Sequence, residues 1–345
     1  MKLTVYVAIL ILVTHASLGQ STISSRQESK PVFRSTSTLV IVPTLVRHVS
    51  GTFVANLDES DFRLTDNGIE QKIFVEQMEN QPLAVAVLMQ TGGEASRQLQ
   101  NYNKLDIMLE QLLANPVSKV ALVTFDSRPE QIWSFPSRTD ALYYFVTHAK
   151  EGDDGAAIMD AVNCAVDLLQ QQPAGFRRII LLLSQAQDDG SKANAEDVVQ
   201  RLAGSETAVY SLTVSPEETG LKDHTAKGSH GDSLHQASRD NSLLSDAIDR
   251  STSLGIVVKA MRRDTAAEVA TLSGGEHLRF QNENDLQHKL SALVGDIHNG
   301  YMLSFYPSSH KSGFHIISVQ VLKQRTRLEV TTRTSYWFGG TDAEK

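Results

Sequence analysis

The stretch Leu83–Ser96, "LAVAVLMQTGGEAS", decides the fold of this chain. Its first seven residues, Leu83–Met89, are all apolar, and Gln90, Thr91 and two glycines follow at once. A run without polar residues predicts a strand that is covered on both faces, as in a parallel sheet between two layers of helices. Such sheets bind their ligands beyond the carboxyl ends of the strands. The polar residues from Gln90 onward are therefore the first candidates for a functional site.

Strand and helix patterns alternate along the chain after this stretch. The predicted strands are 83–89, 119–125, 132–136, 178–184 and 208–214, and the predicted helices are 95–114, 139–148, 156–172, 194–203, 265–273 and 284–299. Strands separated by helices predict right-handed crossovers and a mostly parallel sheet. The expected fold class is therefore α/β, with a Rossmann-like sheet flanked by helices over residues 81–300.

Both ends of this region are rich in β-type patterns. Residues 36–80 contain two apolar runs around Ser50-Gly51 and a strong turn at Asp66-Asn67-Gly68, flanked by residues that alternate between apolar and polar. Residues 301–335 contain three further candidate strands, at 301–307, 315–322 and 327–333. We expect the two segments to build one small β-sandwich into which the α/β domain is inserted.

The N-terminal segment predicts export. Residues 1–19 contain Lys2, the apolar run Val5–Val13 and small residues before a cleavage site near Gln20, as in a secretory signal peptide. The run is too short to span a bilayer comfortably, although its retention as an anchor stays open. The mature chain is expected outside the cytoplasm, periplasmic or secreted, with no membrane contact beyond this segment.

Two segments are polar and lack a periodic apolar pattern. Residues 20–35 are predicted to be a flexible leader, and residues 215–255 a polar loop insertion. The three histidines of the insertion, His224, His230 and His235, have no spacing typical of a metal site, and a solvated loop is the favoured interpretation.

Charge and cysteine content exclude some functions. The formal net charge of −8 is opposite to what a nucleic-acid partner requires. Cys164 is the only cysteine, so an intramolecular disulfide is impossible. Its helical, apolar surroundings predict a buried, unreactive thiol.

Several stretches in a fixed order resemble a known family. They are "DESDFRLTDNGIEQKI", "PLAVAVLMQTGG", "KVALVTFDSRPEQIWSFPSRTDAL", "GDDGAAIMDAV", "RRIILLLSQAQDDGS", "LSGGEHLRF" and "GYMLSFYPSSHKSGFHIISVQV". Together they are similar to exported bacterial proteins with a von Willebrand factor type A (VWA)-related domain. The resemblance implies a metal-ion-dependent adhesion site at the strand ends, built from an Asp-x-Ser-x-Ser pattern, a Thr and a further Asp. Such oxygen ligands suit Mg²⁺, and a carboxylate of the partner protein completes the coordination.

This chain departs from the family pattern at every one of those positions. The corresponding residues are Gln90, Gly92, Glu94, Ala156 and Gln185. Neutral amides and missing side chains cannot offset the dehydration of a small dication. The sequence therefore predicts a degenerate site without metal or other cofactor. We also expect the amides of Gln90 and Gln185 to donate hydrogen bonds to the Glu94 carboxylate.

The loops around this position carry further polar residues, which make up the predicted partner-binding rim. They are Thr91, Glu94, Asp153, Asp154, Gln187, Asp188 and Asp189. The four aspartates leave a displaced Ca²⁺ or Mg²⁺ site open as an alternative, while ordinary turn chemistry is the simpler interpretation of both Asp-Asp pairs.

Catalytic motifs are missing from the sequence. It holds no Gly-x-Ser-x-Gly, His-Glu-x-x-His or P-loop spacing, and Glu276-His277 has no second histidine nearby. The leading prediction is a non-enzymatic, metal-independent protein–protein interaction module. The alternatives are a metal-dependent adhesion domain that uses the displaced acids, and a structural subunit of an envelope assembly. The sequence names neither the partner nor the oligomeric state.

Overall fold

The computed structural model describes residues 39–78, 81–102, 104–135, 143–145, 147–214, 250–322 and 328–339. The predicted signal peptide (1–19), the leader (20–35) and most of the polar insertion, including its three histidines, lie outside the described residues. Among the described residues, no helix is both long and apolar enough to cross a membrane.

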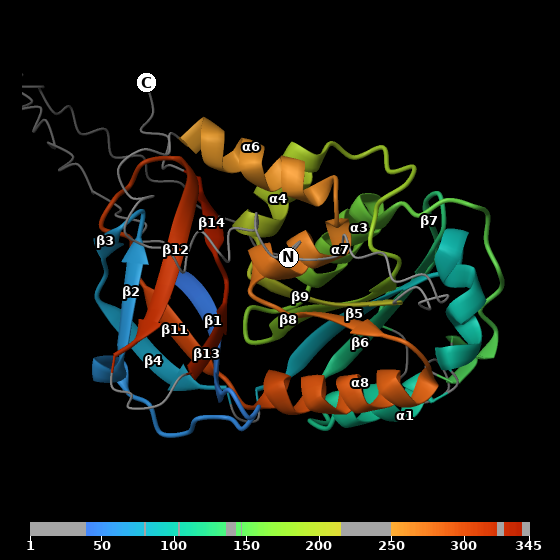
Figure 1. The fold of residues 1–345 in the computed structure, drawn as a ribbon, viewed down its shortest axis with the longest axis horizontal. Helices are drawn as coiled ribbons and strands as arrows, with labels where there is room; N and C mark the ends of the chain where they lie inside the picture. The colour runs from blue at the N-terminus through green and yellow to red at the C-terminus, as the bar shows by residue number, and fades with distance from the viewer. Residues whose placement is uncertain are drawn as a thin grey trace, which may run out of the picture. The chain divides into compact units, whose positions relative to one another are not determined.

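A six-stranded sheet forms the centre of the α/β region (Figure 1). Its strands in spatial order are β10 (His277–Phe280), β9 (Thr207–Val214), β8 (Arg177–Ser184), β5 (Leu83–Gln90), β6 (Lys119–Phe125) and β7 (Pro129–Trp133). All neighbouring pairs are parallel except β6 and β7. Every residue of β5 is buried, as expected of an apolar strand in the middle of a parallel sheet. The predicted α/β fold class is confirmed.

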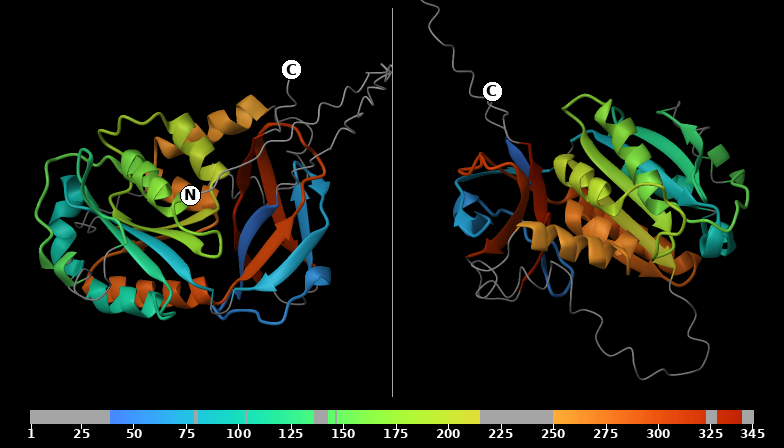
Figure 2. Two further views of the ribbon diagram at one scale, coloured as in Figure 1. Left: turned by 180° about the vertical axis from the view of Figure 1, so that it is seen from behind. Right: turned by 90° about the horizontal axis from the view of Figure 1, so that it is seen from above.

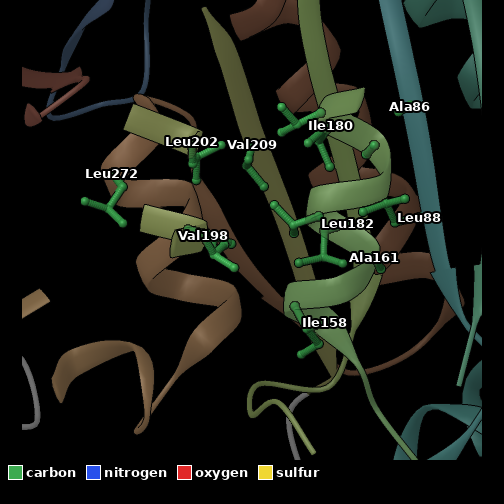
Figure 3. Close-up of a cluster of buried hydrophobic side chains, with 14 of the residues drawn as sticks. Ala86, Leu88, Ile158, Ala161, Ile180, Leu182, Val198, Leu202, Val209 and Leu272 are labelled. Carbon is green, nitrogen blue, oxygen red and sulfur yellow. The ribbon is translucent and has the colours of Figure 1, made fainter. Parts of the chain in front are cut away.

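Helices cover both faces of this sheet (Figures 1 and 2). One face carries α3 (Ile158–Gln170), α4 (Ala195–Gly204), α6 (Arg250–Met261) and α7 (Thr265–Ser273), and the other carries α1 (Leu105–Leu112) and α8 (Glu283–His298). The alternation of side chains along β5 divides its residues between the two cores. Ala86 and Leu88 belong to the same hydrophobic core as Ile158 of α3 and Leu202 of α4 (Figure 3).

One helix prediction and one loop boundary need correction. The expected helix at 95–114 is a 3-10 segment, η2 (Gly93–Tyr102), followed by α1. Leu99 and Tyr102 reach the core from η2, and their spacing of three residues places them on one side of a 3-10 turn. The predicted loop at 215–255 also ends earlier, because α6 begins at Arg250.

Two small antiparallel sheets combine strands from both ends of the chain. One has the order β13 (Leu328–Thr332), β1 (Val40–His48), β11 (Tyr301–Phe305) and β4 (Ile73–Gln77), and the other β14 (Ser335–Phe338), β12 (Gly313–Val321), β2 (Phe62–Asp66) and β3 (Ile69–Glu70). Both sheets contribute to one hydrophobic core, which includes Val42, Leu64, Phe305 and Ile317. The prediction that N- and C-terminal strands build a shared β unit is confirmed.

Three details of this β unit differ from the sequence prediction. The run after Ser50-Gly51 forms only an isolated bridge, between Arg47 and Phe53. Beyond the Asp66-Asn67-Gly68 turn, β2 pairs with the two-residue β3, whereas β4 joins the other sheet beside β11. The last strand, β14, lies almost wholly beyond the predicted boundary at residue 335. Strand partners depend on segments far apart in the chain, which local alternation does not specify.

Candidate functional site

Four loops meet at the carboxyl end of β5, and we call these loops the rim. They comprise residues 90–94, 126–128, 151–157 and 185–191. Their backbones are joined by hydrogen bonds, with Gly93 N donating to Asp153 O at 2.9 Å, Gly152 N to Thr91 O at 2.9 Å and Ala156 N to Asp189 O at 2.7 Å. The rim is thus one connected piece of backbone, which holds the predicted site residues close together.

Gln90 and Gln185 form a paired amide at the centre of the rim. Gln90 is fully buried, and its Nε2 donates to Gln185 Oε1 at 3.0 Å and to Gly92 O at 2.9 Å. The Gln90 Oε1 accepts from Gln185 N at 2.9 Å, and Gln185 Nε2 donates to Gln187 O at 2.9 Å. The prediction that both amides donate to the Glu94 carboxylate is wrong. Glu94 contacts this pair through its backbone N–H, which donates to Gln185 Oε1 at 3.2 Å.

Gly92 allows the loops to approach one another closely. A Cβ atom on Gly92 would lie 2.4 Å from Asp153 O, 2.6 Å from Gly155 O and 2.7 Å from the Cβ of Asp126. Real Cβ atoms do not approach backbone oxygens so closely, so a side chain at position 92 requires the loops to move. The family pattern has a serine here, and in this chain neighbouring backbone occupies that volume.

The residues at the five family positions do not fit a metal ion. Gln90 and Gln185 supply neutral amides that are already hydrogen-bonded to each other, and Gly92 and Ala156 supply no side-chain oxygen. Ala156 instead exchanges two backbone hydrogen bonds with Asp189, at 2.7 and 2.9 Å. Across the described part of the chain, no three His, Cys, Asp or Glu side chains are grouped as metal ligands.

Asp126 is a structural residue of the rim that the sequence analysis missed. It is 8% exposed, and its Oδ2 accepts from Asp153 N at 3.2 Å. Asp153 in turn accepts from Ser127 Oγ at 2.5 Å and from Gly155 N at 2.8 Å. The Ser127 hydroxyl, followed by the Gly155 N–H, lowers the pKa of Asp153 and favours its carboxylate form. Asp126 stands between two predicted strands in "TFDSRP", where an aspartate is typical of a turn.

Asp188 belongs to a second loop network. Its Oδ1 accepts from Met159 N at 2.9 Å, in the first turn of α3, and from Ser191 Oγ at 2.5 Å. Its backbone N–H donates to Thr265 Oγ1 at 3.1 Å, at the start of α7. Since Asp153 and Asp188 serve different loops, the four aspartates do not converge on a common point as the displaced cation site requires.

The solvent-facing part of the rim is acidic. Glu94, Asp154 and Asp189 are exposed, and within the described residues no side-chain hydrogen bond or ion pair engages their carboxylates. Gln187 is also exposed, and its Nε2 donates to Arg263 O at 3.0 Å. Thr91 needs correction, because it is 3% exposed and its hydroxyl donates inward to Phe125 O at 3.3 Å. A partner can therefore reach the predicted rim residues except Thr91.

Cys164 and Ser211 are two nucleophilic side chains of the α/β region that are poorly placed for catalysis. Burial, with a contribution from Asp167, raises the pKa of the Cys164 thiol and disfavours the thiolate. Ser211 Oγ lies 2.8 Å from His277 Nδ1, but Ser211 is fully buried within β9. Burial also lowers the pKa of His277. The Glu276 carboxylate pairs with Arg47 at 3.0 Å, and the hydrogen bond between Glu276 and Ser211 is one of backbone groups only, from Ser211 N to Glu276 O at 2.9 Å.

Several solved structures are similar to this chain. No protein-family model and no curated protein matches the sequence. The conserved hypothetical protein BatB from Bacteroides thetaiotaomicron matches with 16% identity and a TM-score of 0.39, over 62% of this chain and 98% of that one. Proximal thread matrix protein 1 from the mussel byssus, with a zinc-occupied MIDAS motif, matches with 12% identity and a TM-score of 0.43, over 68% and 50%.

A third solved structure is named as a VWF domain. It is the vWF domain of the type V pili tip protein Mfa5 from Porphyromonas gingivalis, with 16% identity and a TM-score of 0.28, over 31% of this chain and 38% of that one. All three identities are far below the level at which function is shared. The fold class of this chain therefore rests on its own strand order and helix layers.

Proposed function

We propose that this chain is an exported, non-enzymatic protein-binding module of the VWA type, which binds its partner through the rim without a metal ion. The observation that supports this most directly is the pairing of Gln90 with Gln185. In the family pattern both positions hold metal-binding carboxylates. In this chain the Gln90 amide bonds to the side chain and backbone of Gln185 and to Gly92 O, and Gln185 Nε2 donates to Gln187 O, so both amides are satisfied without a charged ligand.

The partner surface is cationic in this proposal. A metal-bearing rim attracts a carboxylate of its partner, whereas this rim presents the free carboxylates of Glu94, Asp154 and Asp189 to solvent. Lys or Arg side chains complement such a surface and accelerate association at low salt. The contact is therefore expected to weaken as ionic strength rises.

The three other candidate functions have less support. A metal-dependent adhesion domain needs convergent acids, yet Asp153 and Asp188 are bound within separate loops. Catalysis needs an accessible nucleophile or an acid–base pair, whereas the central groups of the rim are amides and backbone. An envelope subunit would use surfaces outside the rim, so the test below distinguishes it.

The test has two parts and uses the full chain. Calorimetric titration with Mg²⁺, Mn²⁺ and Ca²⁺ is expected to give no saturable heat. Capture of partners from exported fractions is expected to be equal in EDTA and in Mg²⁺, and to be lost in the double reversal Glu94→Lys/Asp154→Lys. Glu110→Lys/Glu59→Lys is the matched control, since it makes the same charge change at exposed sites away from the rim.

Each part can overturn the proposal. Saturable metal binding, or capture that requires Mg²⁺, contradicts metal independence. Capture that survives the rim reversal but fails in the control places the contact elsewhere and favours the structural-subunit alternative.

A further inference from the structure

The strand β4 forms an open edge of its sheet, apart from the rim. β11 is its neighbour on one side, and β4 is the last strand in the sheet order (Figure 1). Met78 N donates to Gly300 O at 2.9 Å, in the register that pairs Gln77 with Tyr301. Hydrogen-bonded and non-hydrogen-bonded pairs alternate along an antiparallel ladder. The backbone groups of Ile73 and Val75 therefore face away from β11, toward the free edge.

The outer face of this edge carries an ordered set of exposed side chains. Lys72, Phe74 and Glu76 alternate with the inward residues Ile73 and Val75, and Phe74 is 41% exposed. No ion pair engages Lys72 or Glu76 among the described residues. Beside them, the half-exposed Tyr306 ring lies edge-on to Phe74, with the ring centroids 6.3 Å apart.

We propose that two copies of this chain form a symmetric dimer by antiparallel pairing of their β4 strands about a two-fold axis at Phe74. In this register, Ile73 of each copy lies opposite Val75 of the other, and these two residues form a hydrogen-bonded pair. Phe74 lies opposite Phe74 of the second copy as a non-hydrogen-bonded pair, in which side chains are closest. Lys72 lies opposite Glu76 of the second copy, and the symmetry repeats this ion pair.

Charge complementarity favours a second copy of this chain as the pairing strand, and it also favours one register. Shifting the axis to Lys72 or to Glu76 places like charges directly opposite, which destabilises a strand pair. An axis at Ile73 or Val75 places Phe74 opposite Lys72 or Glu76 and leaves the charges unpaired. Only the axis at Phe74 pairs both charges and both aromatic rings. The sequence of β4 is thus complementary to itself.

Two features that protect sheet edges from pairing, a proline and a bulge, are absent from β4, although the strand is short and a lysine adjoins it. The strand contains no proline, glycine or bulge, and its register with β11 is regular. The turn η1 (Glu59–Asp61) contacts β4 and limits the length of strand that a second copy can add. The proposed pairing therefore rests on residues 72–76 and is expected to be weak and concentration-dependent.

Light scattering after size exclusion, over a concentration series of the full chain, tests the proposal. The wild type is expected to approach twice the monomer mass. Lys72→Glu and Glu76→Lys each replace two attractive pairs with two repulsive ones, and each is expected to weaken dimerisation about tenfold or more. The double variant Lys72→Glu/Glu76→Lys exchanges the charges and is expected to restore the dimer, which excludes a folding defect.

Cysteine cross-linking tests the register. Phe74→Cys places two thiols across the axis within disulfide range, so oxidation is expected to give a covalent dimer. Glu76→Cys is the matched control, since its counterpart across the interface is Lys72. A wild type that stays monomeric, single reversals that leave the mass unchanged, a double variant that is not restored, or equal cross-linking of both cysteine variants would each overturn the proposal.

Discussion

At the scale of single residues, the loops of the rim are held together by residues that no sequence motif identifies. Gln90 bonds to both the side chain and the backbone of Gln185, and Gly92 leaves room for the carbonyl oxygens of Asp153 and Gly155. An amide at the buried strand end has different requirements from a carboxylate. A carboxylate there needs a cation or several donors, whereas an amide pair supplies both donors and acceptors.

Glu268 on α7 gives a prediction for pH dependence. It is 8% exposed, and burial, followed by repulsion from Asp264, raises its pKa from 4.5 to about 7. The folded state thus binds more protons than the unfolded state between these values. The stabilisation from this group is complete below pH 4.5 and is lost as the pH rises through about 7. Asp296, whose pKa burial raises to about 6, acts in the same direction.

Urea unfolding at about pH 5 and about pH 8 measures this effect. Ionisation of Glu268 and Asp296 at the higher pH is expected to make the wild type less stable there than at the lower pH. Glu268→Gln mimics the protonated form and is expected to raise the free energy of unfolding by about 2 kcal/mol near pH 8, with little change near pH 5. The exposed Glu110→Gln is the control. Equal effects of Glu268→Gln at both pH values would contradict the assignment.

At the scale of elements, side chains from distant segments complete the helix ends. The residue before α3, Ala157, has no capping side chain, and Asp188 accepts the Met159 N–H instead. At the opposite end of α3, Arg178 Nε donates to Leu169 O at 3.0 Å. Arg177, at the adjoining position of β8, donates to Ile297 O of α8 at 2.7 Å. One Arg-Arg pair therefore serves the C-termini of two helices on opposite faces of the sheet.

The capping role of Asp188 predicts a stability loss. Asp188→Ala leaves the first turn of α3 and the Ser191 hydroxyl without their acceptor, and is expected to cost about 1–2 kcal/mol of unfolding free energy. Asp189→Ala is the matched control: the adjacent carboxylate is exposed and has no such contact, so its loss is expected to cost less than about 0.5 kcal/mol. Urea unfolding of both variants makes the comparison. Equal losses would contradict the cap.

At the scale of the whole described molecule, arginines join the β unit to the α/β region. Arg333 is 5% exposed, and it donates to Ser335 O at 2.6 Å, to Ile41 O at 3.4 Å and to Ala203 O at the end of α4. Burial lowers the pKa of this guanidinium to about 10, so it stays charged at neutral pH. Arg47 of β1 makes ion pairs with Asp296 at 2.7 Å and with Glu276 at 3.0 Å.

Arg333→Met is expected to weaken this junction. The apolar side chain fills similar space but leaves the three carbonyl oxygens without their donor, at a cost of about 3 kcal/mol. The chain has two tryptophans, Trp133 in β7 and Trp337 in β14. Trp337 packs against the α/β core and Trp133 lies in the edge strand β7, so Trp→Phe variants at each position allow fluorescence to follow the junction and the far edge of the six-stranded sheet separately during urea unfolding.

The two tryptophan signals are expected to share one midpoint in the parent chain, and the Trp337 signal is expected to change first in Arg333→Met. Arg63→Met is the control, because Arg63 is 47% exposed and lies 3.4 Å from an exposed Glu70. An Arg333→Met midpoint equal to that of the control would show that Arg333 does not hold the junction.

The sequence by itself determined the α/β class and most of the strands. A continuous apolar run of seven β-forming and small residues such as Leu83–Met89 is typical of a strand covered on both faces, and the alternating helices favour the parallel order. The position of the rim followed, because strand ends of a parallel sheet share one edge. The tight turn at Asp66-Asn67-Gly68 was equally readable, since turn chemistry depends on adjacent residues.

Only the tertiary structure decided which partners the polar groups of the rim bond to. Gln90 and Gln185 are 95 positions apart, and no local pattern distinguishes a bond between them from a bond to Glu94. The same holds for Asp188 capping α3 and for β4 leaving its neighbour β2 for the other sheet. Periodicity reports which face of an element is buried. The partner of a polar group depends on which distant backbone fills the remaining space, and packing of the whole chain sets that.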